Sequence, residues 1–339
     1  MITARIRNTR SLVMPVLIFS VLAVAMVSLL VGAAPLSIAD VWSGLRDGDG
    51  VTGLIVREIR MPRMLLSVTI GAFLGLSGAA LQGLLQNPLA EAAIFGAPQA
   101  AALGAVLVLY LGFSDALSFW LPLASICGAG LSGALLYLLV GRQGSIIGFI
   151  LAGLALGSFT GAAISLVINL SANPFAITEI VFWLMGSFED RSVKHVFLSL
   201  PFLIVASVLI FLNGRGYRAL TLGADTASSL GINVAVVQWT TVTAIAIGTG
   251  AGVAVSGAIG FVGLIAPHLA RSLAGADPQR ILAPSAFLGS ILLTCADIAV
   301  RLIPSTSEIK IGAVTSLLGA PLFLYLVIAR RYSSAGTLE

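Results

Sequence analysis

Charged residues along this chain are separated by long stretches that contain none. The uncharged runs cover residues 11–39, 64–90, 92–114, 116–141, 143–178, 195–214, 226–270, 281–296 and 311–329. A helix needs about 20 mostly apolar residues to cross a membrane. The run 226–270 is long enough for two spans and is expected to fold back near Gly257, whereas 281–296 must continue through Asp297 and Arg301 to cross. The pattern therefore predicts an all-α, polytopic integral membrane protein with about ten transmembrane helices.

The composition agrees with this class. Hydrophobic residues make up 58% of the 339 and charged residues 9%, with a mean hydropathy of +1.06. A soluble core of this length could not bury so much apolar surface, so we expect one transmembrane domain over 1–339. The run 11–39 is longer than a signal-peptide core and is expected to remain as an anchor. An even number of spans and basic residues near both ends predict cytoplasmic termini.

Residues that could support catalysis or hold a metal are scarce. No phosphate-binding G-x-x-x-x-G-K-[ST] loop occurs, and His195 and His268 are isolated. Cys127 and Cys295 lie inside apolar runs, as thiols used for packing do. The net charge of +4 fits basic inner loops and gives no indication of nucleic-acid binding. We therefore expect no enzymatic activity, no metal site and no cofactor in this chain.

Ionisable residues in mid-span are the usual sign of ion-coupled transport. Here the long runs lack them, apart from Asp297 and Arg301 near the end of one span. These two are four residues apart, and one interpretation is that they neutralise each other on one helix face. A proton- or sodium-driven carrier remains an alternative with little support.

A polar segment of about residues 215–234 joins the sixth and seventh spans on the predicted inner side. Asp225 is placed to stabilise the start of a short helix, and Gly231 to end it. Leu222, Ala227 and Leu230 would form a small apolar face. Such a helix could fit a groove on a partner protein; the alternative is an ordinary interfacial helix.

Arginines gather on the predicted outer side, against the usual bias. Arg57, Arg60 and Arg63 precede the second span, and Arg301 ends another span on the same side. The cluster suits an acidic partner surface, or side chains that reach toward lipid headgroups.

Short motifs occur in a fixed order along nearly the whole chain. They lie at 60–63 (R-M-P-R), 77–83 (S-G-A-A-L-Q-G), 87–90 (N-P-L-A), 151–153 (L-A-G), 183–187 (W-L-M-G-S), 222–231, 260–271 (G-F-V-G-L-I-A-P-H-L-A-R), 296–297 and 312–321. In combination they resemble the FecCD family of ABC importer permeases, which serve ferric siderophores, haem and cobalamin. Two segments depart from the family pattern: 91–101, and 308–312, where Lys310 stands in place of proline.

The resemblance implies a type II importer fold in a bacterial plasma membrane. It implies a second permease subunit, identical or paralogous, around a central path, and surrounding membrane lipid. Two separate ATPase subunits would bind ATP-Mg below, and a periplasmic or lipoprotein substrate-binding protein would dock above. A ferric siderophore is the expected cargo, with haem or cobalamin as alternatives.

The resemblance also assigns roles to residues. It implies that Arg60, Arg63 and Arg301 meet acidic residues of the binding protein. The expected ATPase-coupling residues are Leu222, Gly223, Asp225, Ala227, Leu230, Gly231 and Asn233. A cytoplasmic gate is expected just before 151–153, where Gly144 and Gly148 permit backbone adjustment, at Ser145, Ile146, Ile147 and Gly148.

Overall fold

The computed structural model describes residues 2–46, 50–112, 120–141, 145–304, 308–321 and 324, with side chains from residue 12 onward. Every regular element in these ranges is helical. In chain order they are α1 (Ile2–Leu30), α2 (Ile38–Arg46), α3 (Gly50–Leu54), the π-helical η1 (Ile55–Arg60), α4 (Met61–Leu84), the 3₁₀ helix η2 (Ala92–Phe95), α5 (Ala97–Tyr110), α6 (Trp120–Val140), α7 (Ile146–Leu170), α8 (Pro174–Leu184), α9 (Val193–Leu212), α10 (Gly214–Leu220), α11 (Ala224–Ser229), α12 (Val234–Ser256), α13 (Val262–Ala274), α14 (Pro278–Leu302) and a last helix at Ile311–Pro321.

The number of apolar helices agrees with the prediction of about ten spans. Among the described residues, seven are long and apolar enough to cross a membrane: Leu12–Leu30, Gly50–Leu84, Trp120–Val140, Ile146–Leu170, Val193–Leu212, Val234–Ser256 and Leu282–Leu302. Three shorter apolar helices accompany them, at Ala97–Tyr110, Pro174–Leu184 and Ile311–Pro321. The all-α, polytopic class is therefore confirmed.

The run 226–270 folds back where expected, but its second half differs from the prediction. Helix α12 ends at Ser256, and Gly257 follows with φ of 68°. Helix α13 then has only 13 residues, about 20 Å at 1.5 Å per residue, which is shorter than the hydrocarbon layer. The expectation of two full spans in this run is wrong, because the non-helical residues 257–261 take up part of its length.

The second long helix starts well before its uncharged run. Helical structure is continuous from α3 through η1 to the end of α4, so a single rod covers Gly50–Leu84. Charge spacing placed the start of this span at residue 64. The arginines at 57, 60 and 63 consequently lie inside a helix that packs against its neighbours, and not on its exposed end.

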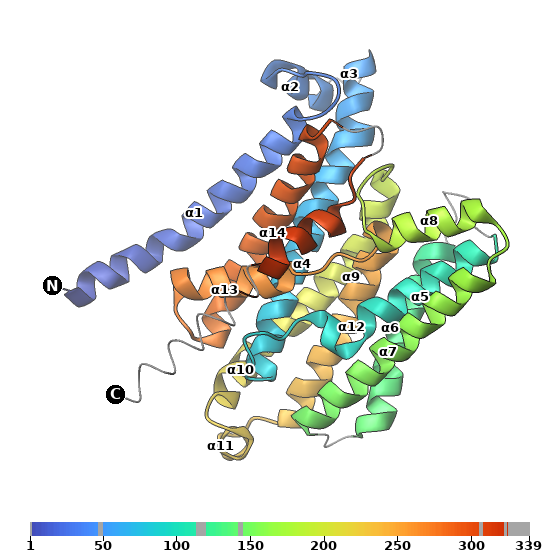
Figure 1. Cartoon of the computed structure of the whole chain (residues 1–339). Coiled ribbons are helices and arrows are strands. Elements are labelled where there is room, and N and C mark those ends of the chain that lie inside the picture. The colour runs from blue at the N-terminus through green and yellow to red at the C-terminus, as the bar shows by residue number, and fades with distance from the viewer. Residues whose placement is uncertain are drawn as a thin grey trace.

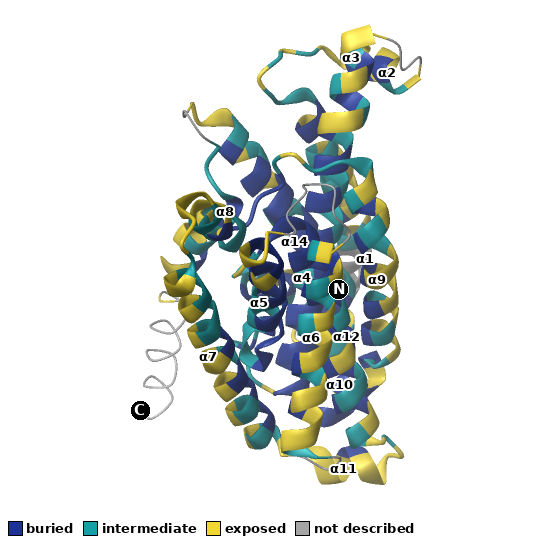
Figure 2. Ribbon diagram, turned by 90° about the vertical axis from the view of Figure 1, so that its right-hand side faces the viewer, coloured by how far each residue is buried: buried dark blue, intermediate teal, exposed yellow. Residues whose placement is uncertain are grey.

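Helices α4, α12 and α14 form the centre of the bundle, and α1, α6, α7 and α9 lie around them (Figure 1). The most apolar window is 67% buried for Gly50–Leu84 and 61% for both Val234–Ser256 and Leu282–Leu302, against 17% for α7. Figure 2 shows the same contrast between dark central helices and the exposed face of α7. Helix α11 lies at the opposite end of the bundle from α2 and α3 (Figure 1).

Glycines allow the central helices to touch through their backbones. A Cβ atom at Gly75 would lie 2.1 Å from the carbonyl oxygen of Ser285 in α14, and one at Gly78 only 1.8 Å from that of Gly263 in α13. Gly71 and Gly289 approach each other in the same way. Small residues four apart thus serve the close packing that membrane helices favour.

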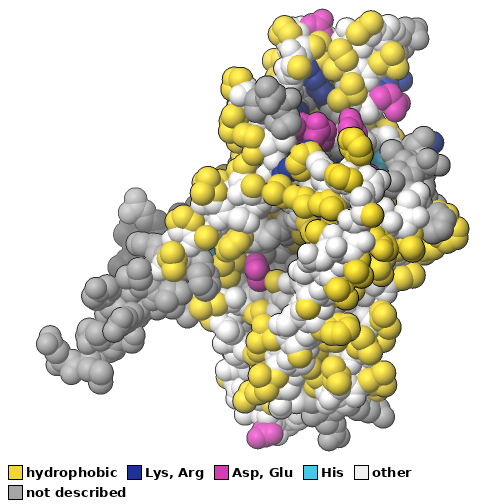
Figure 3. Space-filling view, turned by 45° about the vertical axis from the view of Figure 1, so that its right-hand side comes forward, with side chains coloured by type: hydrophobic (Ala, Val, Ile, Leu, Met, Phe, Trp, Pro, Cys, Tyr) yellow, Lys and Arg dark blue, Asp and Glu magenta, His cyan; other side chains and the backbone are white. Residues whose placement is uncertain are grey.

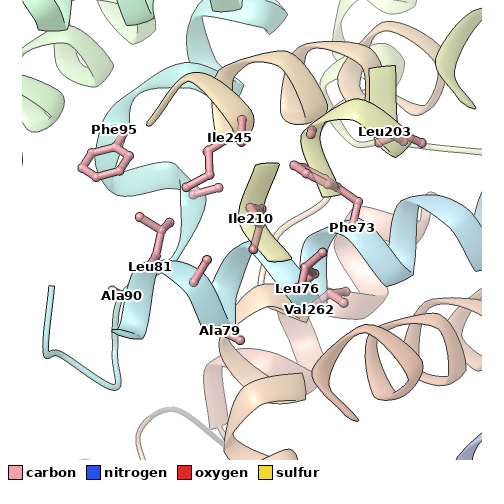
Figure 4. Close-up of a cluster of buried hydrophobic side chains, with 14 of the residues drawn as sticks. Phe73, Leu76, Ala79, Leu81, Ala90, Phe95, Leu203, Ile210, Ile245 and Val262 are labelled. Carbon is pink, nitrogen blue, oxygen red and sulfur yellow. The ribbon is translucent and has the colours of Figure 1, made fainter. Parts of the chain in front are cut away.

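A cluster of buried apolar side chains joins these helices (Figure 4). Phe73 and Leu76 of α4 lie with Leu203 of α9, Ile245 of α12 and Val262 of α13, all at most 3% exposed. Side chains from four helices therefore share one core, which holds the central helices together as a unit.

Candidate functional site

The segment 215–234 contains the predicted short helix. Helix α11 is preceded by Gly223, with φ of 93°, and followed by Gly231, with φ of 82°. Asp225 lies in its first turn, where a negative charge is favoured by the helix dipole. The two positive φ angles let the chain enter and leave the helix sharply, at little cost for glycine. The helix thus begins and ends at the residues that the sequence indicated.

Its apolar face differs from the prediction. Leu222 and Leu230 are 61% and 63% exposed, whereas Ala227 is fully buried and belongs to the chain's own core. The expectation that Ala227 presents its side chain to a partner is therefore wrong, because the helix turns this face inward. The large apolar side chains that this segment exposes are those of Leu222 and Leu230.

Asn233 is the N-cap residue of α12. Its side-chain oxygen accepts a hydrogen bond from the Val236 backbone N–H at 3.2 Å, which caps the start of α12. The end of the segment 215–234 is therefore fixed to α12, which is central to the bundle.

An ion pair joins the other side of this segment to α14. Arg218 of α10 contacts Asp277 with Nη2 and Oδ2 2.6 Å apart, and Asp277 also accepts from the Gln279 backbone N–H at 3.0 Å. Burial acts to raise the pKa of Asp277, but the hydrogen bonds from Arg218 and from the Gln279 and Arg280 N–H groups outweigh it and lower the pKa. The charged carboxylate is thus the form that the fold stabilises.

We expect Asp277→Ala to destabilise the protein by about 1 kcal/mol, because it removes a helix cap and a partly exposed ion pair. The pKa is lower in the folded chain, so this contribution is complete above the unfolded pKa near 4 and is lost as the pH falls through the folded value. Thermal unfolding in detergent should show a difference between wild type and variant at pH 7 that shrinks in acid. A difference that is independent of pH, or as large for Glu179→Ala on exposed α8, would contradict this.

The three outer arginines are buried, not exposed. Arg60 and Arg63 are 4% and 7% exposed, and the Arg301 side chain is 8% exposed. The expectation of free guanidinium groups at an outer surface is therefore wrong for the conformation described. Their role in docking a binding protein is not tested by these contacts and stays a prediction.

Two of them satisfy the carbonyl groups at the end of α1. Arg60 donates to the backbone oxygens of Leu29 and Leu30 at 2.8 and 2.7 Å, and Arg301 to those of Ser28 and Val31 at 2.9 Å each. The last carbonyls of a helix have no partner within it, and cations are favoured there. These arginines thus hold α1 against α4 and α14.

The third arginine lies in a buried cluster of charges around Asp297, which is fully buried in α14. Arg63 Nε lies 2.8 Å from Asp297 Oδ1, and Arg301 Nη2 lies 2.9 Å from Oδ2. Arg63 also pairs with both carboxylate oxygens of Glu308. The interpretation that Asp297 and Arg301 neutralise each other is therefore confirmed as an ion pair, and Arg63 with Glu308 extends it across three segments.

Lys310 makes a second link on the same side. Its Nζ lies 2.6 Å from Glu189 Oε2 and 5.1 Å from the centre of the Phe182 ring. The next backbone N–H groups, of Ile311 and Gly312, donate to the carbonyls of Gly186 and Met185 at 2.9 Å. Lysine in place of the usual proline thus ties the segment 308–312 to the loop after α8.

The residues expected to form the inner gate begin helix α7. Ser145 is its N-cap and accepts from the Gly148 N–H at 3.0 Å. Ile147 is 68% exposed, and Ile146 and Gly148 are partly exposed. Gly144 lies outside the described residues. The gate itself stays a prediction, and what the contacts show is an ordinary helix start.

A cavity of about 560 Å³ lies between the central helices and the loop that separates α12 from α13. Its walls come from α4, the segment around η2, α5, α12, residues 257–261 and the last helix. Figure 3 shows one face of the molecule, on which hydrophobic side chains border a hollow. The described lining contains one charged residue, Glu91, and no cation.

Glu91 lines this cavity together with Phe261, whose φ is 66°. A phenylalanine in the left-handed region is uncommon, and such strained residues gather at functional sites. The sequence contained a signal for this site, because Glu91 separates two long uncharged runs, but it could not indicate that the carboxylate faces a cavity. No group of three or more His, Cys, Asp or Glu that could hold a metal occurs in the described ranges.

Comparison with known proteins agrees with the motifs. The model of the FecCD transport family matches residues 19–329. The probable siderophore transport system permease protein YfiZ of Bacillus subtilis (strain 168) is 33% identical over 96% of this chain and 97% of its own length. The vitamin B12 import system permease protein BtuC of Vibrio cholerae (serotype O1, El Tor Inaba N16961) is 37% identical over 91% of each chain.

A solved structure described as "An inward-facing conformation of a putative metal-chelate type ABC transporter" is 31% identical, with a TM-score of 0.85 over 94% of this chain and 99% of that one. The bundle of apolar helices, the short helix between α10 and α12 and the order of motifs thus occur together with a family match over nearly the whole sequence. The chain belongs to the FecCD transport family and is a multi-pass membrane permease of a bacterial ABC importer.

Proposed function

We propose that this permease carries a ferric siderophore or a similar metal chelate into the cytoplasm. The observation that carries the proposal is the full-length similarity to a permease named for siderophore transport. Cobalamin is the second candidate, since a permease named for vitamin B12 import is similar over almost as much of the chain. Because the chain carries no phosphate-binding loop, ATP would be hydrolysed on two separate subunits.

The arrangement of the two ends supports a division of tasks between them. Helix α11 would contact the ATPase on the cytoplasmic side, and the end that carries α2 and α3 would face the substrate-binding protein, with both termini cytoplasmic. Packed interfaces switch between discrete arrangements, so a push on α11 would pass to α12 and the central helices. A second permease subunit, identical or paralogous, would complete the path.

The test is uptake into proteoliposomes that contain the permease, its ATPase and its binding protein. We expect accumulation of ferric chelate or cobalamin that requires ATP. Uptake that follows an ion gradient and needs no ATPase would instead show a secondary transporter, and absence of flux for any chelate would refute import.

The exposed leucine pair allows a sharper test of coupling. Replacing Leu222 and Leu230 together by glutamate should reduce co-purification of the ATPase at least tenfold, because burial of one leucine contributes about 1.5–3 kcal/mol. The melting temperature of the permease alone should hardly change, since both side chains are exposed. Leu54→Glu, an equally exposed leucine at the opposite end, is the matched control. Normal co-purification by the double variant would show that α11 is only an interfacial helix.

A further inference from the structure

The cavity beside Glu91 has open space at two of the glycines in its lining. A Cβ at Gly252 would meet only Ile70, at 3.7 Å, and one at Gly260 would meet nothing within 4 Å. The volume of about 560 Å³ falls in the range of small-molecule sites.

The polar groups at this cavity include a carboxylate and an amide oxygen, both of which accept hydrogen bonds. Glu91 brings a negative charge, and the buried side-chain oxygen of Gln99 has no hydrogen-bond partner in the described structure. A carboxylate accepts up to about four hydrogen bonds. Buried acceptors without donors are costly, so a ligand that offers N–H or O–H groups would fit them.

Resting on the import function proposed above, we propose that this cavity contacts the cargo and that Glu91 makes it selective for neutral or cationic metal chelates with N–H or O–H donors. A chelate with net negative charge would approach a carboxylate in a low-dielectric site whose described lining holds no compensating cation. Specificity of this kind comes from repulsion of the wrong ligand as much as from contacts to the right one. The inference thus separates uncharged and cationic cargo from polyanionic ferric complexes.

The experiment uses three gallium complexes of one linear trihydroxamate, which differ only at the chain end. The end is a free ammonium, an N-acetyl group or an N-succinyl carboxylate, so the net charges are +1, 0 and −1. Equilibrium dialysis measures binding to the permease–ATPase complex in nanodiscs without the binding protein, so that only the permease path selects. We expect affinity to fall from the ammonium to the succinyl form by at least about tenfold.

Glu91→Gln keeps the size of the side chain and removes its charge. We expect the spread between the three complexes to shrink to within about threefold in this variant. Glu179→Gln, the same change on exposed α8, should keep the wild-type order, and Gly252→Leu should weaken all three by filling the cavity. A wild-type order that Glu91→Gln leaves unchanged, or no binding of any complex, would overturn the inference.

The import function is measured separately, with the same variants. ATP-dependent uptake of chelate by proteoliposomes with the binding protein tests import, whatever the charge preference of the cavity. Uptake that persists while the charge series shows no dependence on Glu91 would overturn this inference alone, whereas absence of uptake would overturn the proposed function.

Discussion

Replacement of Asp297 by asparagine should destabilise the permease by about 3–5 kcal/mol. The carboxylate is completely buried between Arg63 and Arg301, and removing one member of a buried ion pair leaves charge without compensation. With Asp297 neutral, only Glu308 would remain in the cluster to balance the two guanidinium groups. Thermal unfolding followed by size-exclusion chromatography in detergent should show a melting temperature at least about 5 °C lower.

Two comparisons separate this effect from a general loss of charge. Glu58→Gln, on an exposed residue of η1 at the same end, should leave the melting temperature unchanged within about 1 °C. Asp297→Asn combined with Arg301→Gln should be less destabilising than the sum of the two single changes, because the residues are in contact. Strict additivity would show that Asp297 and Arg301 are not coupled, and a stable Asp297→Asn variant would show that the cluster contributes little.

The other large effect is expected at Gly78, where α4 touches the backbone of α13. A methyl group there would lie 1.8 Å from the Gly263 carbonyl oxygen and 2.7 Å from its Cα. Neither atom can move by a change of rotamer, so Gly78→Ala must separate two central helices. We expect a loss of at least about 3 kcal/mol, at the upper end of overpacking effects, and a marked fall in folded protein.

The matched control is the same substitution in another helix. A Cβ at Gly161 of α7 would meet nothing within 4 Å, so Gly161→Ala should be neutral or stabilising by up to about 1 kcal/mol, since alanine is the better helix former. The two alanine variants should therefore change the melting temperature in opposite directions or to very different extents. Equal effects would mean that the close approach of α4 and α13 does not limit stability.

Charge and hydropathy spacing predicted the approximate number of apolar helices and the position of the main chain reversal, because both depend on local composition. An apolar run must be about 20 residues long to cross the hydrocarbon, and Gly257 interrupts the run 226–270 where a positive φ is needed. The limits of α11 followed for the same reason, since the charge of Asp225 acts on the first turn of its own helix and Gly231 ends the helix through its own φ angle. Family motifs predicted the membership that the full-length match confirms.

Contacts between distant segments could not be predicted in this way. The sequence placed Arg60, Arg63 and Arg301 at an outer surface, because arginine is costly in lipid, but it could not indicate that Asp297 and Glu308 lie within reach. A buried arginine is tolerated only where its charge and donors are satisfied. For Arg63 the condition is met by Asp297 and Glu308, which are more than 200 positions away in the sequence. For Arg60 and Arg301 the carbonyl groups at the end of α1 accept the hydrogen bonds.

The sequence by itself determined the class of this protein, the approximate spans, the short inner helix and the family. Only the tertiary structure decided which face of α11 is free, since Ala227 turns inward and leaves Leu222 and Leu230 exposed. It also decided that Glu91 borders a cavity, because that cavity exists between helices far apart in the chain. Local propensities depend on neighbouring residues, whereas exposure, ion pairing and cavities depend on how the helices pack.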